Sequence, residues 1–271
     1  MTKQLMIYES VVPISIARHK DTSVKTGLTF EFAEDLNAVP LLASEFAAAS
    51  GTFPIVFTSA DPPMPLAVLG LRDQQNLFVD EDKSWSGRYT PNFLRQYPFV
   101  FAKSNDGERL TLCIDDAYEG VNAEGRGERL FDSEGERTQY LRNILEFAQA
   151  YQQDFAVTEA FCKRLAEHKL FDPMQAQVLV GTEMVTLQGF MAVSKDKLKQ
   201  LDDEEVLSLF RIDGLELIYR HIASLGLFPS LADRISQNAP GPAKDDSAGK
   251  SESAASASEP ADGPDDKAPL H

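Results

Sequence analysis

Apolar residues in the first half of the chain recur in short runs or alternate with polar residues, which is typical of β-strands. The clearest run, FPIVFTS at residues 53–59, is bounded by proline and by the turn sequence DPPMP. Two short helices are predicted after Pro40 and over residues 90–97, where proline stands at a helix start. The other expected strands are residues 10–17 (at a sheet edge, because of Pro13), 28–33, 66–71 paired with 76–80 as a hairpin, 98–102 and 109–115.

From residue 136 onward the apolar positions recur every three or four residues, which predicts amphipathic helices. Helices are expected at residues 136–151 and 157–169, with a hairpin at residues 176–193. Two or three further helices close the fold, and Gly226 is expected to cap the last one. The predicted core stripe of that helix is Leu215, Ile218, Tyr219, Ile222 and Leu225.

These patterns predict an α+β fold in which a strand-rich N-terminal half packs against a helical C-terminal half. A single globular domain is expected over residues 1–235, because the helix stripes need the strands of residues 53–115 as a partner. Residues 236–271 are dense in Ser, Ala, Pro, Gly and Asp, with hardly any large apolar side chain. Such a segment cannot bury enough surface to offset its ordering entropy, so a disordered acidic tail is expected.

Charge narrows the classes of function. The formal net charge is −16 and the isoelectric point is near 4.7. Binding to nucleic acid or to an anionic membrane surface is disfavoured, because both depend on Lys and Arg. The remaining classes are a basic or neutral protein partner, a small ligand, and acidity that serves solubility alone.

The N-terminus and the cysteines predict a compartment. The first twenty residues are too polar for a signal peptide, and no run of about eighteen apolar residues predicts a transmembrane segment. Cys113 and Cys162 lie in apolar contexts without a CxxC pair, which favours small buried side chains over a disulfide or zinc site. The chain is expected to be cytoplasmic, and export by a route without an amino-terminal signal stays open.

Motifs for catalysis and metal binding are weak. The glycine-rich residues 120–128 lack the Lys-Ser/Thr of a P-loop, and there is no GxSxG or HExxH. Residues 80, 82 and 84 have the spacing of a calcium loop, but Trp85 stands where that loop needs glycine. Asp115 and Asp116 follow a strand and are expected to be solvated carboxylates. We therefore expect no cofactor and no metal, and leave catalytic residues unassigned.

Residues 85–101, WSGRYTPNFLRQYPFVF, combine the only tryptophan with two tyrosines, three phenylalanines and two arginines. Aromatic clusters are most often core, but Trp, Tyr and Arg are also the residue types enriched in binding hot spots. Both interpretations stay open. The candidate ligand- or partner-binding residues are Glu45, Trp85, Arg88, Tyr89 and Arg95.

Glu45 is the acid of most interest in this set, because it stands on a mostly apolar short helix. If its side chain is buried, its pKa must rise or it must meet a cation such as Arg88 or Arg95. A structural ion pair is favoured over an acid–base role.

Eight segments, taken together, resemble the SapC family: PLLASEF, FPIVF, LAVLGLR, NLFVD, RYTPNFLRQYPFVF, LCID, LFDSEGERTQYL and GLELIYRHIASLGL, in this order within residues 5–232. The resemblance implies a bacterial protein of about this length that is linked to the formation or export of surface-layer proteins. It supplies no catalytic residues. A peptide-transporter permease shares the family's name, but this chain predicts no membrane span.

Two functions agree with these observations. The first is a non-enzymatic accessory or binding protein for surface-layer or envelope protein formation or export, whose aromatic and arginine residues contact the client. The alternative is a small-ligand-binding protein or an enzyme with a pocket lined by Glu45, Trp85, Tyr89 and Arg95. A closed cavity joining these four side chains favours the alternative.

Overall fold

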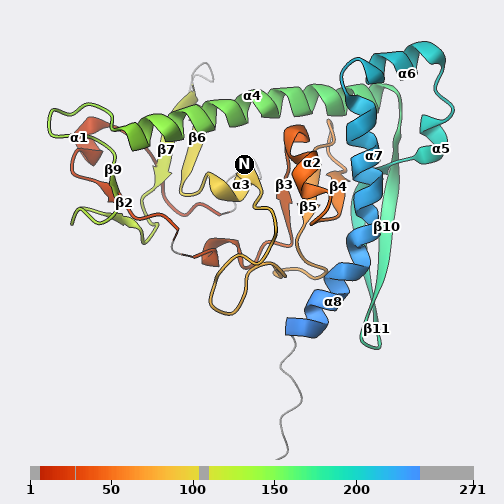
Figure 1. The fold of residues 1–271 in the computed structure, drawn as a ribbon, viewed down its shortest axis with the longest axis horizontal. Helices are drawn as coiled ribbons and strands as arrows, with labels where there is room; N and C mark the ends of the chain where they lie inside the picture. The colour runs from red at the N-terminus through yellow and green to blue at the C-terminus, as the bar shows by residue number, and fades with distance from the viewer. Residues whose placement is uncertain (1–6, 28, 104–109, 239–271) are drawn as a thin grey trace, which may run out of the picture. The chain divides into compact units, whose positions relative to one another are not determined.

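The computed structural model describes residues 7–27, 29–103 and 110–238. It confirms the α+β fold, with strands prevailing in the N-terminal half and helices in the C-terminal half (Figure 1). Contacts divide the chain into one unit at Met1–Asn238 and another at Ala239–His271. The last helix runs to Asn238, past the domain end expected at residue 235, and the rest of the predicted disordered tail lies outside the described residues.

The larger sheet has five strands in the order β10-β11-β4-β5-β3, and all neighbours are antiparallel. The predicted apolar runs form β4 (Ile55–Thr58) and β5 (Pro65–Val68), with β3 (Ala38–Pro40) beside β5. The predicted second-half hairpin is confirmed and is longer than expected, with β10 (Phe171–Val180) and β11 (Glu183–Val193). Strands from both halves of the sequence therefore share one sheet.

The hairpin expected between residues 66–71 and 76–80 is wrong. β5 is already paired on both of its edges, by β3 and by β4, so no edge is left for residues 76–80. They form a loop that makes one isolated bridge, between Val79 and Trp85. The loop turns back tightly at Gly70, where a Cβ would lie 2.0 Å from the carbonyl oxygen of Gln75.

The second sheet has three antiparallel strands in the order β1-β7-β6. These are β1 (Val11–Pro13), β6 (Phe99–Lys103) and β7 (Leu110–Asp115). Pro13 lies in an edge strand, as predicted, because proline has no N–H to donate to a ladder. The strand expected to reach residue 17 ends early, and helix α1 (Ile16–His19) follows it.

A third, small sheet joins short strands in the order β8-β2-β9. Its members are β2 (Ser23–Val24), β8 (Val121–Asn122) and β9 (Glu128–Arg129). This sheet ties the glycine-rich loop to the N-terminal segment. The loop has a structural role here, since Gly127 has φ +94 and a Cβ there would lie 2.3 Å from the carbonyl oxygen of Val24.

Short helical segments in the first half of the chain agree with the predictions at two places and differ at residues 31–33. The two predicted short helices are confirmed as η3 (Ala43–Glu45) with α2 (Phe46–Ala49), and α3 (Asn92–Arg95). The strand expected at residues 28–33 is wrong where the chain is described, because η2 (Glu31–Ala33) is a 3-10 turn. The phenylalanines of that segment pack on other aromatic rings instead of alternating across a sheet.

The longest element is α4 (Gln139–Glu167), one continuous helix of 29 residues where the sequence predicts two. Residues 152–156 contain no proline or glycine, so nothing there interrupts the backbone hydrogen bonds. Thr138 caps the start of α4, since its hydroxyl accepts from the N–H of Leu141 at 3.3 Å. In Figure 1, α4 runs across the top of the described unit. Its two predicted stripes face different cores.

Five helical segments follow β11: α5 (Lys195–Leu198), α6 (Asp203–Phe210), α7 (Gly214–Ser224), η4 (Leu225–Leu227) and α8 (Phe228–Asn238). The cap expected at Gly226 is wrong, because the chain continues from α7 through η4 into α8. Ile218 is buried as predicted, whereas Tyr219 is 58% exposed and does not belong to the core stripe.

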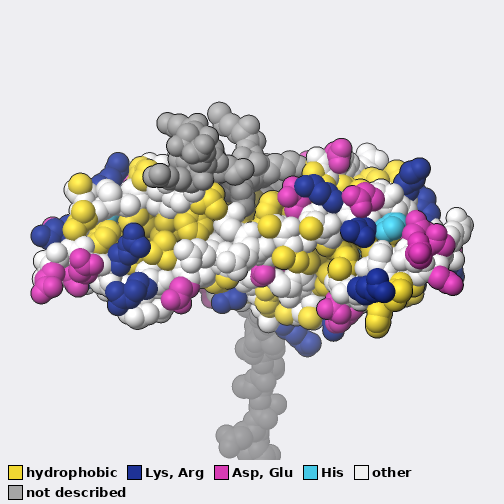
Figure 2. Space-filling model, turned by 90° about the horizontal axis from the view of Figure 1, so that it is seen from above, with side chains coloured by type: hydrophobic (Ala, Val, Ile, Leu, Met, Phe, Trp, Pro, Cys, Tyr) yellow, Lys and Arg dark blue, Asp and Glu magenta, His cyan; other side chains and the backbone are white. Residues whose placement is uncertain are grey.

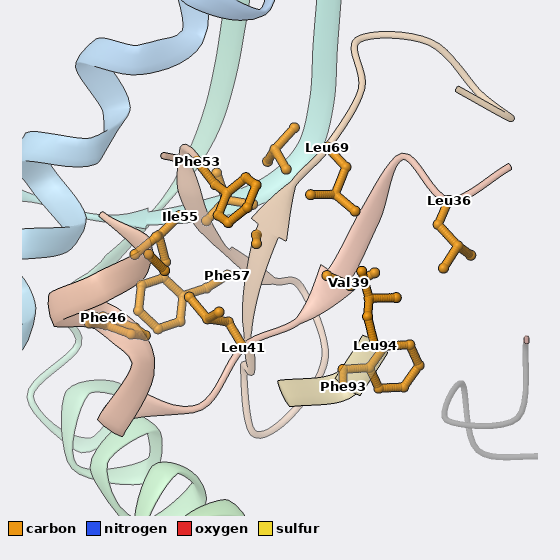
Figure 3. Close-up of a cluster of buried hydrophobic side chains, with 14 of the residues drawn as sticks. Leu36, Val39, Leu41, Phe46, Phe53, Ile55, Phe57, Leu69, Phe93 and Leu94 are labelled. Atoms are coloured by element: carbon orange, nitrogen blue, oxygen red, sulfur yellow. The ribbon is translucent and has the colours of Figure 1, made fainter. Parts of the chain in front are cut away.

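The main core lies where the larger sheet meets the short helices and α7 (Figure 3). Phe57 is fully buried, and its ring lies edge-on to Phe171 at 4.9 Å and to His221 at 5.0 Å. A smaller core lies between the β1-β7-β6 sheet and the first half of α4, where Leu112 and Leu141 are buried. The first half of α4 thus covers one sheet and the second half covers the main core.

Candidate functional site

Residues 85–101, the aromatic segment, pack mainly against the main core. Trp85 is half-buried, and its indole N–H donates to the carbonyl oxygen of Tyr89 at 2.9 Å. Its ring lies 5.4 Å from the ring of Phe30 and stacks on that of Phe78 at 5.7 Å. Trp85 therefore holds the loop before α3 against the core.

Glu45 lies at the centre of the predicted set, and it is 3% exposed. Its carboxylate accepts hydrogen bonds from the N–H of Leu42 at 2.8 Å, the hydroxyl of Tyr89 at 2.8 Å and the N–H of Asn92 at 2.7 Å. The two N–H groups stand at the starts of η3 and α3, so one carboxylate caps two helices. Burial raises the pKa of Glu45, and the hydrogen bonds and Arg95 oppose this only in part.

The two arginines of the set lie at the surface. The guanidinium of Arg95 lies 5.4 Å from the ring centroid of Phe147 in α4 and donates to Asn92 Oδ1 at 3.1 Å. Arg88 is exposed. Of the two outcomes expected for a buried Glu45, its pKa rises, and no ion pair with either arginine is found among the described residues. The structure brings Glu45, Trp85 and Tyr89 together and leaves both arginines outside.

Replacing Glu45 with glutamine should change how stability depends on pH. The pKa of Glu45 is raised in the folded protein, so folding favours its protonated form, and stability is lost as the pH rises above about 4.5. Urea unfolding at pH 4, 6 and 8 should show the wild type losing stability relative to Glu45→Gln as the pH rises. A constant difference between the two proteins would contradict this.

Asp115 is a buried acid that the sequence does not reveal. It is fully buried rather than solvated as expected, and its carboxylate accepts from the N–H groups of Glu9 at 2.8 Å, Ser10 at 2.8 Å and Ala117 at 3.2 Å. Asp116 is the one that reaches the surface, where it pairs with Arg18. Asp115 has a structural role, because it holds the chain before β1 onto the end of β7.

An open groove of about 1010 Å³ lies between α4 and the β1-β7-β6 sheet. Its floor is mainly apolar and comes from the strands, from the chain after β1 and from α4; it includes Ile14, Ile16, Phe101, Leu110, Leu112, Phe131, Leu141 and Leu145. Leu110 and Ile16 are each 46% exposed. In Figure 2 hydrophobic side chains are exposed on both halves of the face, including the left half, which in Figure 1 holds β6, β7 and the first part of α4.

The rim of this groove is polar. Arg137 and Arg142 stand at its α4 N-terminal end, with Glu136 as the acid beside them. Farther along α4, past Leu145, the wall of the groove is formed by the side-chain amides of Gln149, Gln152 and Gln153. No motif or pattern in the sequence predicts this groove. The available signal was the spacing of these glutamines, which follow the stripe of Leu141 and Leu145 on one helix.

The groove and the predicted site residues are separate. None of Glu45, Trp85, Arg88, Tyr89 and Arg95 lines the groove or the second cavity described below. The predicted binding role of these five residues stays a prediction.

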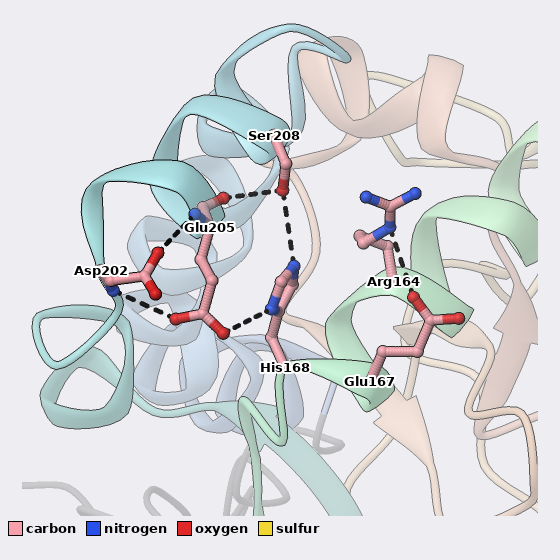
Figure 4. A network of polar contacts seen from close by, with 6 residues as sticks. All are labelled: Arg164, Glu167, His168, Asp202, Glu205 and Ser208. Carbon is pink, nitrogen blue, oxygen red and sulfur yellow. Dashed lines mark hydrogen bonds and ion pairs between the residues drawn. The ribbon is translucent and has the colours of Figure 1, made fainter.

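A second polar cluster stands at the C-terminal end of α4 (Figure 4). His168 Nδ1 lies 3.1 Å from Glu205 Oε1, and His168 Nε2 lies 3.4 Å from Ser208 Oγ. Ser, His and Glu in this order are the components of a hydrolase triad. The hydroxyl of Ser208, however, donates to the carbonyl oxygen of Glu205 at 2.7 Å, so its proton is not directed at His168.

This cluster instead joins two helices. Glu205 completes a capping box with Asp202, in which the N–H of each residue donates to the other's carboxylate, at 2.8 and 3.0 Å. An adjoining cavity of about 260 Å³ is lined by His168, Lys169, Lys197, Gln200, Leu201 and Glu205. Ser208 does not line it. The contacts fix the end of α4 to the start of α6 and give no activated nucleophile.

The cysteines and acids of the described residues add no reactive centre. Cys113 and Cys162 are free and buried, as predicted. Burial raises the pKa of Cys162 to about 12 and also raises that of Cys113, so neither is a ready thiolate at neutral pH. Within the part of the chain that the structure describes, no group of three or more His, Cys, Asp or Glu residues is placed to hold a metal ion.

Comparison with known families decides the identity at the family level. A family model described as SapC matches residues 14–231, which is most of the chain. The chain belongs to the SapC family. The SapC match contains the groove, the Glu45 cluster and the His168 cluster, and it ends within α8. No curated protein and no solved structure gives a significant match.

Among the described helices of this SapC protein, none combines the length and the apolar character needed to cross a membrane.

Proposed function

We propose that this SapC family protein is a non-enzymatic accessory protein that binds a protein client during the formation or export of surface-layer or envelope proteins. The observation that carries the binding role is the groove between α4 and the β1-β7-β6 sheet. Its volume of about 1010 Å³ is at the upper end for small-molecule pockets, and exposed leucine and isoleucine lie on its floor. Family membership supports the link to the surface layer.

The lining of the groove favours binding over catalysis. Its described residues include no histidine and no cysteine, and the polar ones are mainly amides and guanidinium groups. Such groups hold and orient a partner without needing to transfer protons. We place the encounter with the client in the cytoplasm, as the sequence predicts.

The client contact therefore shifts away from most of the residues first predicted. Glu45, Trp85 and Tyr89 are engaged with one another and with the main core. Arg88 and Arg95 are exposed and stay available for a secondary contact with a client.

Affinity capture from native cells tests the proposal. The full chain should enrich a surface-layer or envelope protein, and Leu110→Asp should reduce that enrichment by about tenfold, because it places a charge on the apolar floor. Leu110 is 46% exposed at the start of β7, so the folded state tolerates the change. Mass spectrometry with isotope-labelled reference peptides measures the enrichment.

Leu179→Asp is the matched control. Leu179 is also a strand leucine, in β10, it is 59% exposed and it lies outside the groove. This variant should capture the client as the wild type does. Equal capture by all three proteins, or a set of captured proteins without any from the envelope, would remove the proposal.

A further inference from the structure

The lining of the groove indicates what kind of client segment can bind there. We infer that the groove binds an extended segment of the protein client, with apolar side chains on the floor and a carboxylate at Arg137 and Arg142. The inference rests on the proposed function, since it specifies the partner of the same groove. Three features carry it: the length of the groove, its amide wall and its charge.

The length of the groove suits a short extended peptide. The α4 residues that line it run from Leu141 to Gln153. Twelve helical steps span about 18 Å. An extended chain rises about 3.3 Å per residue, so about five or six residues fill this length. The groove therefore takes a strand-like segment of a protein rather than a single side chain.

The amide wall indicates that this segment is extended. Gln149, Gln152 and Gln153 follow one another at helical spacings on the groove side of α4, and none of their side-chain amides hydrogen-bonds to another described residue. Each amide offers N–H donors and a carbonyl acceptor. An extended chain has backbone N–H and C=O groups that need such partners, whereas the interior of a helix has already paired its own.

The charge of the groove selects an acidic group. The chain as a whole carries −16, yet among the described residues the groove lining holds Arg137 and Arg142 and one acid, Glu136. Neither arginine has a carboxylate within ion-pair distance among the described residues. Arg142 is held in place through Gln139 Oε1, at 3.3 and 3.4 Å, and through the carbonyl oxygen of Arg137.

These two guanidinium groups are the feature that distinguishes acidic from neutral clients. An arginine that is already oriented loses little side-chain freedom when it binds a carboxylate, and its planar donors match the two carboxylate oxygens. The acidic surface elsewhere on the chain repels a carboxylate. An acidic client residue is therefore favoured at this end of the groove and disfavoured over most of the remaining surface.

Peptide selection against the full chain tests the inference. Random heptapeptides displayed on phage are selected on the intact protein, then synthesised with a fluorescein label and titrated by fluorescence anisotropy. The selected peptides should alternate apolar residues and share an aspartate or glutamate. Arg142→Glu should weaken their binding by about tenfold, and peptides with lysine in place of the acid should bind this variant better than the wild type.

Matched variants separate the groove from the rest of the surface. Arg211→Glu changes an exposed arginine next to α6, outside the groove, and should leave peptide binding unchanged. Leu110→Asp should abolish peptide binding, and Leu179→Asp should not. Circular dichroism melting of each variant confirms that it is folded before it is titrated.

Several outcomes overturn the inference. Selected peptides without a shared acid, binding that ignores Arg142→Glu, or no selected peptide at all would each do so. Binding of labelled palmitate that Leu110→Asp abolishes would assign the groove to a lipid. Self-association in sedimentation that Leu110→Asp abolishes would assign it to a second copy of this chain.

These outcomes can be told apart from failure of the proposed function. If the native client is lost with Leu110→Asp while the peptides show no acid preference, client binding stands and the extended acidic segment is wrong. If the native client is captured equally by Leu110→Asp, the proposed function itself is wrong.

Discussion

Lowering the pH from 7 to 4 should reduce the free energy of unfolding by about 3 kcal/mol through one side chain, His221. His221 is fully buried, its Nε2 accepts from the N–H of Val193 at 3.0 Å, and its Nδ1 lies 2.8 Å from the carbonyl oxygen of Ile55. This pairing requires the proton on Nδ1 and a bare Nε2. Burial lowers the pKa of His221 from 6.5 to about 4, and the hydrogen bond to Ile55 opposes this only in part.

The direction of the effect follows from which state binds the proton. Between pH 6.5 and 4 the unfolded chain protonates His221 and the folded protein does not, so stability falls as the pH falls through this range. A proton on Nε2 also displaces the N–H of Val193 from its acceptor, which joins α7 to the end of β11.

Urea unfolding of the wild type and of His221→Gln at pH 7, 5.5 and 4 isolates this contribution from the many acids of the chain. The variant is less stable at pH 7, because glutamine does not reproduce both hydrogen bonds in the same geometry. The difference between the two proteins should shrink toward pH 4. A difference that is independent of pH would show that His221 does not titrate in this window.

Asp115→Ala should lower the free energy of unfolding by about 4 kcal/mol, since a hydrogen bond to a charged group contributes about 1.5–3 kcal/mol and three part-buried bonds of this kind are lost. The carboxylate accepts three backbone N–H groups, from Glu9, Ser10 and Ala117, and alanine leaves all of them without an acceptor. The loss releases the chain that precedes β1 from the end of β7. Chemical unfolding monitored by circular dichroism measures it.

Asp116→Ala is the matched control for Asp115, because the two acids are neighbours in sequence. Asp116 makes a surface ion pair with Arg18, whose side chain is 57% exposed. Such pairs contribute about 1 kcal/mol or less. Similar costs for the two substitutions would mean that the carboxylate of Asp115 does not anchor this segment.

The contrast between Asp115 and Asp116 shows that the sequence pattern does not predict which of the two acids is buried. Alternation along a strand correctly predicts that Asp115 and Asp116 face opposite sides. It does not show what covers either side. The N-terminal segment that covers Asp115 comes from residues 9 and 10, more than a hundred positions earlier, so no local pattern contains that contact.

Helix α4 also shows what the sequence pattern does not predict, in this case the continuity of the helix. The apolar stripes of residues 136–151 and 157–169 are correctly assigned to helices, but they are predicted as two separate helices. In the structure α4 is continuous, and its two halves face two different cores. A change of stripe is therefore a change of packing partner in this chain and not an end of the helix.

The candidate site was predicted less well than the fold. Glu45, Trp85 and Tyr89 are in contact, as a shared role requires, but the contacts are those of helix capping and core packing. The groove was missed because its floor comes from α4 and from the β1-β7-β6 sheet. Each of those stretches reads as an ordinary amphipathic element by itself.

Local pattern was sufficient for the features that depend on neighbouring residues. It established the α+β class, most helices and strands, the buried cysteines and, through eight ordered segments, SapC membership. The folded arrangement alone established which strands pair, which of Asp115 and Asp116 is buried, and that an open groove beside α4 holds two arginines with no ion pair to a described residue. The physical reason is that periodicity shows which face of an element is apolar, whereas pairing, burial and cavities depend on residues far away in the chain.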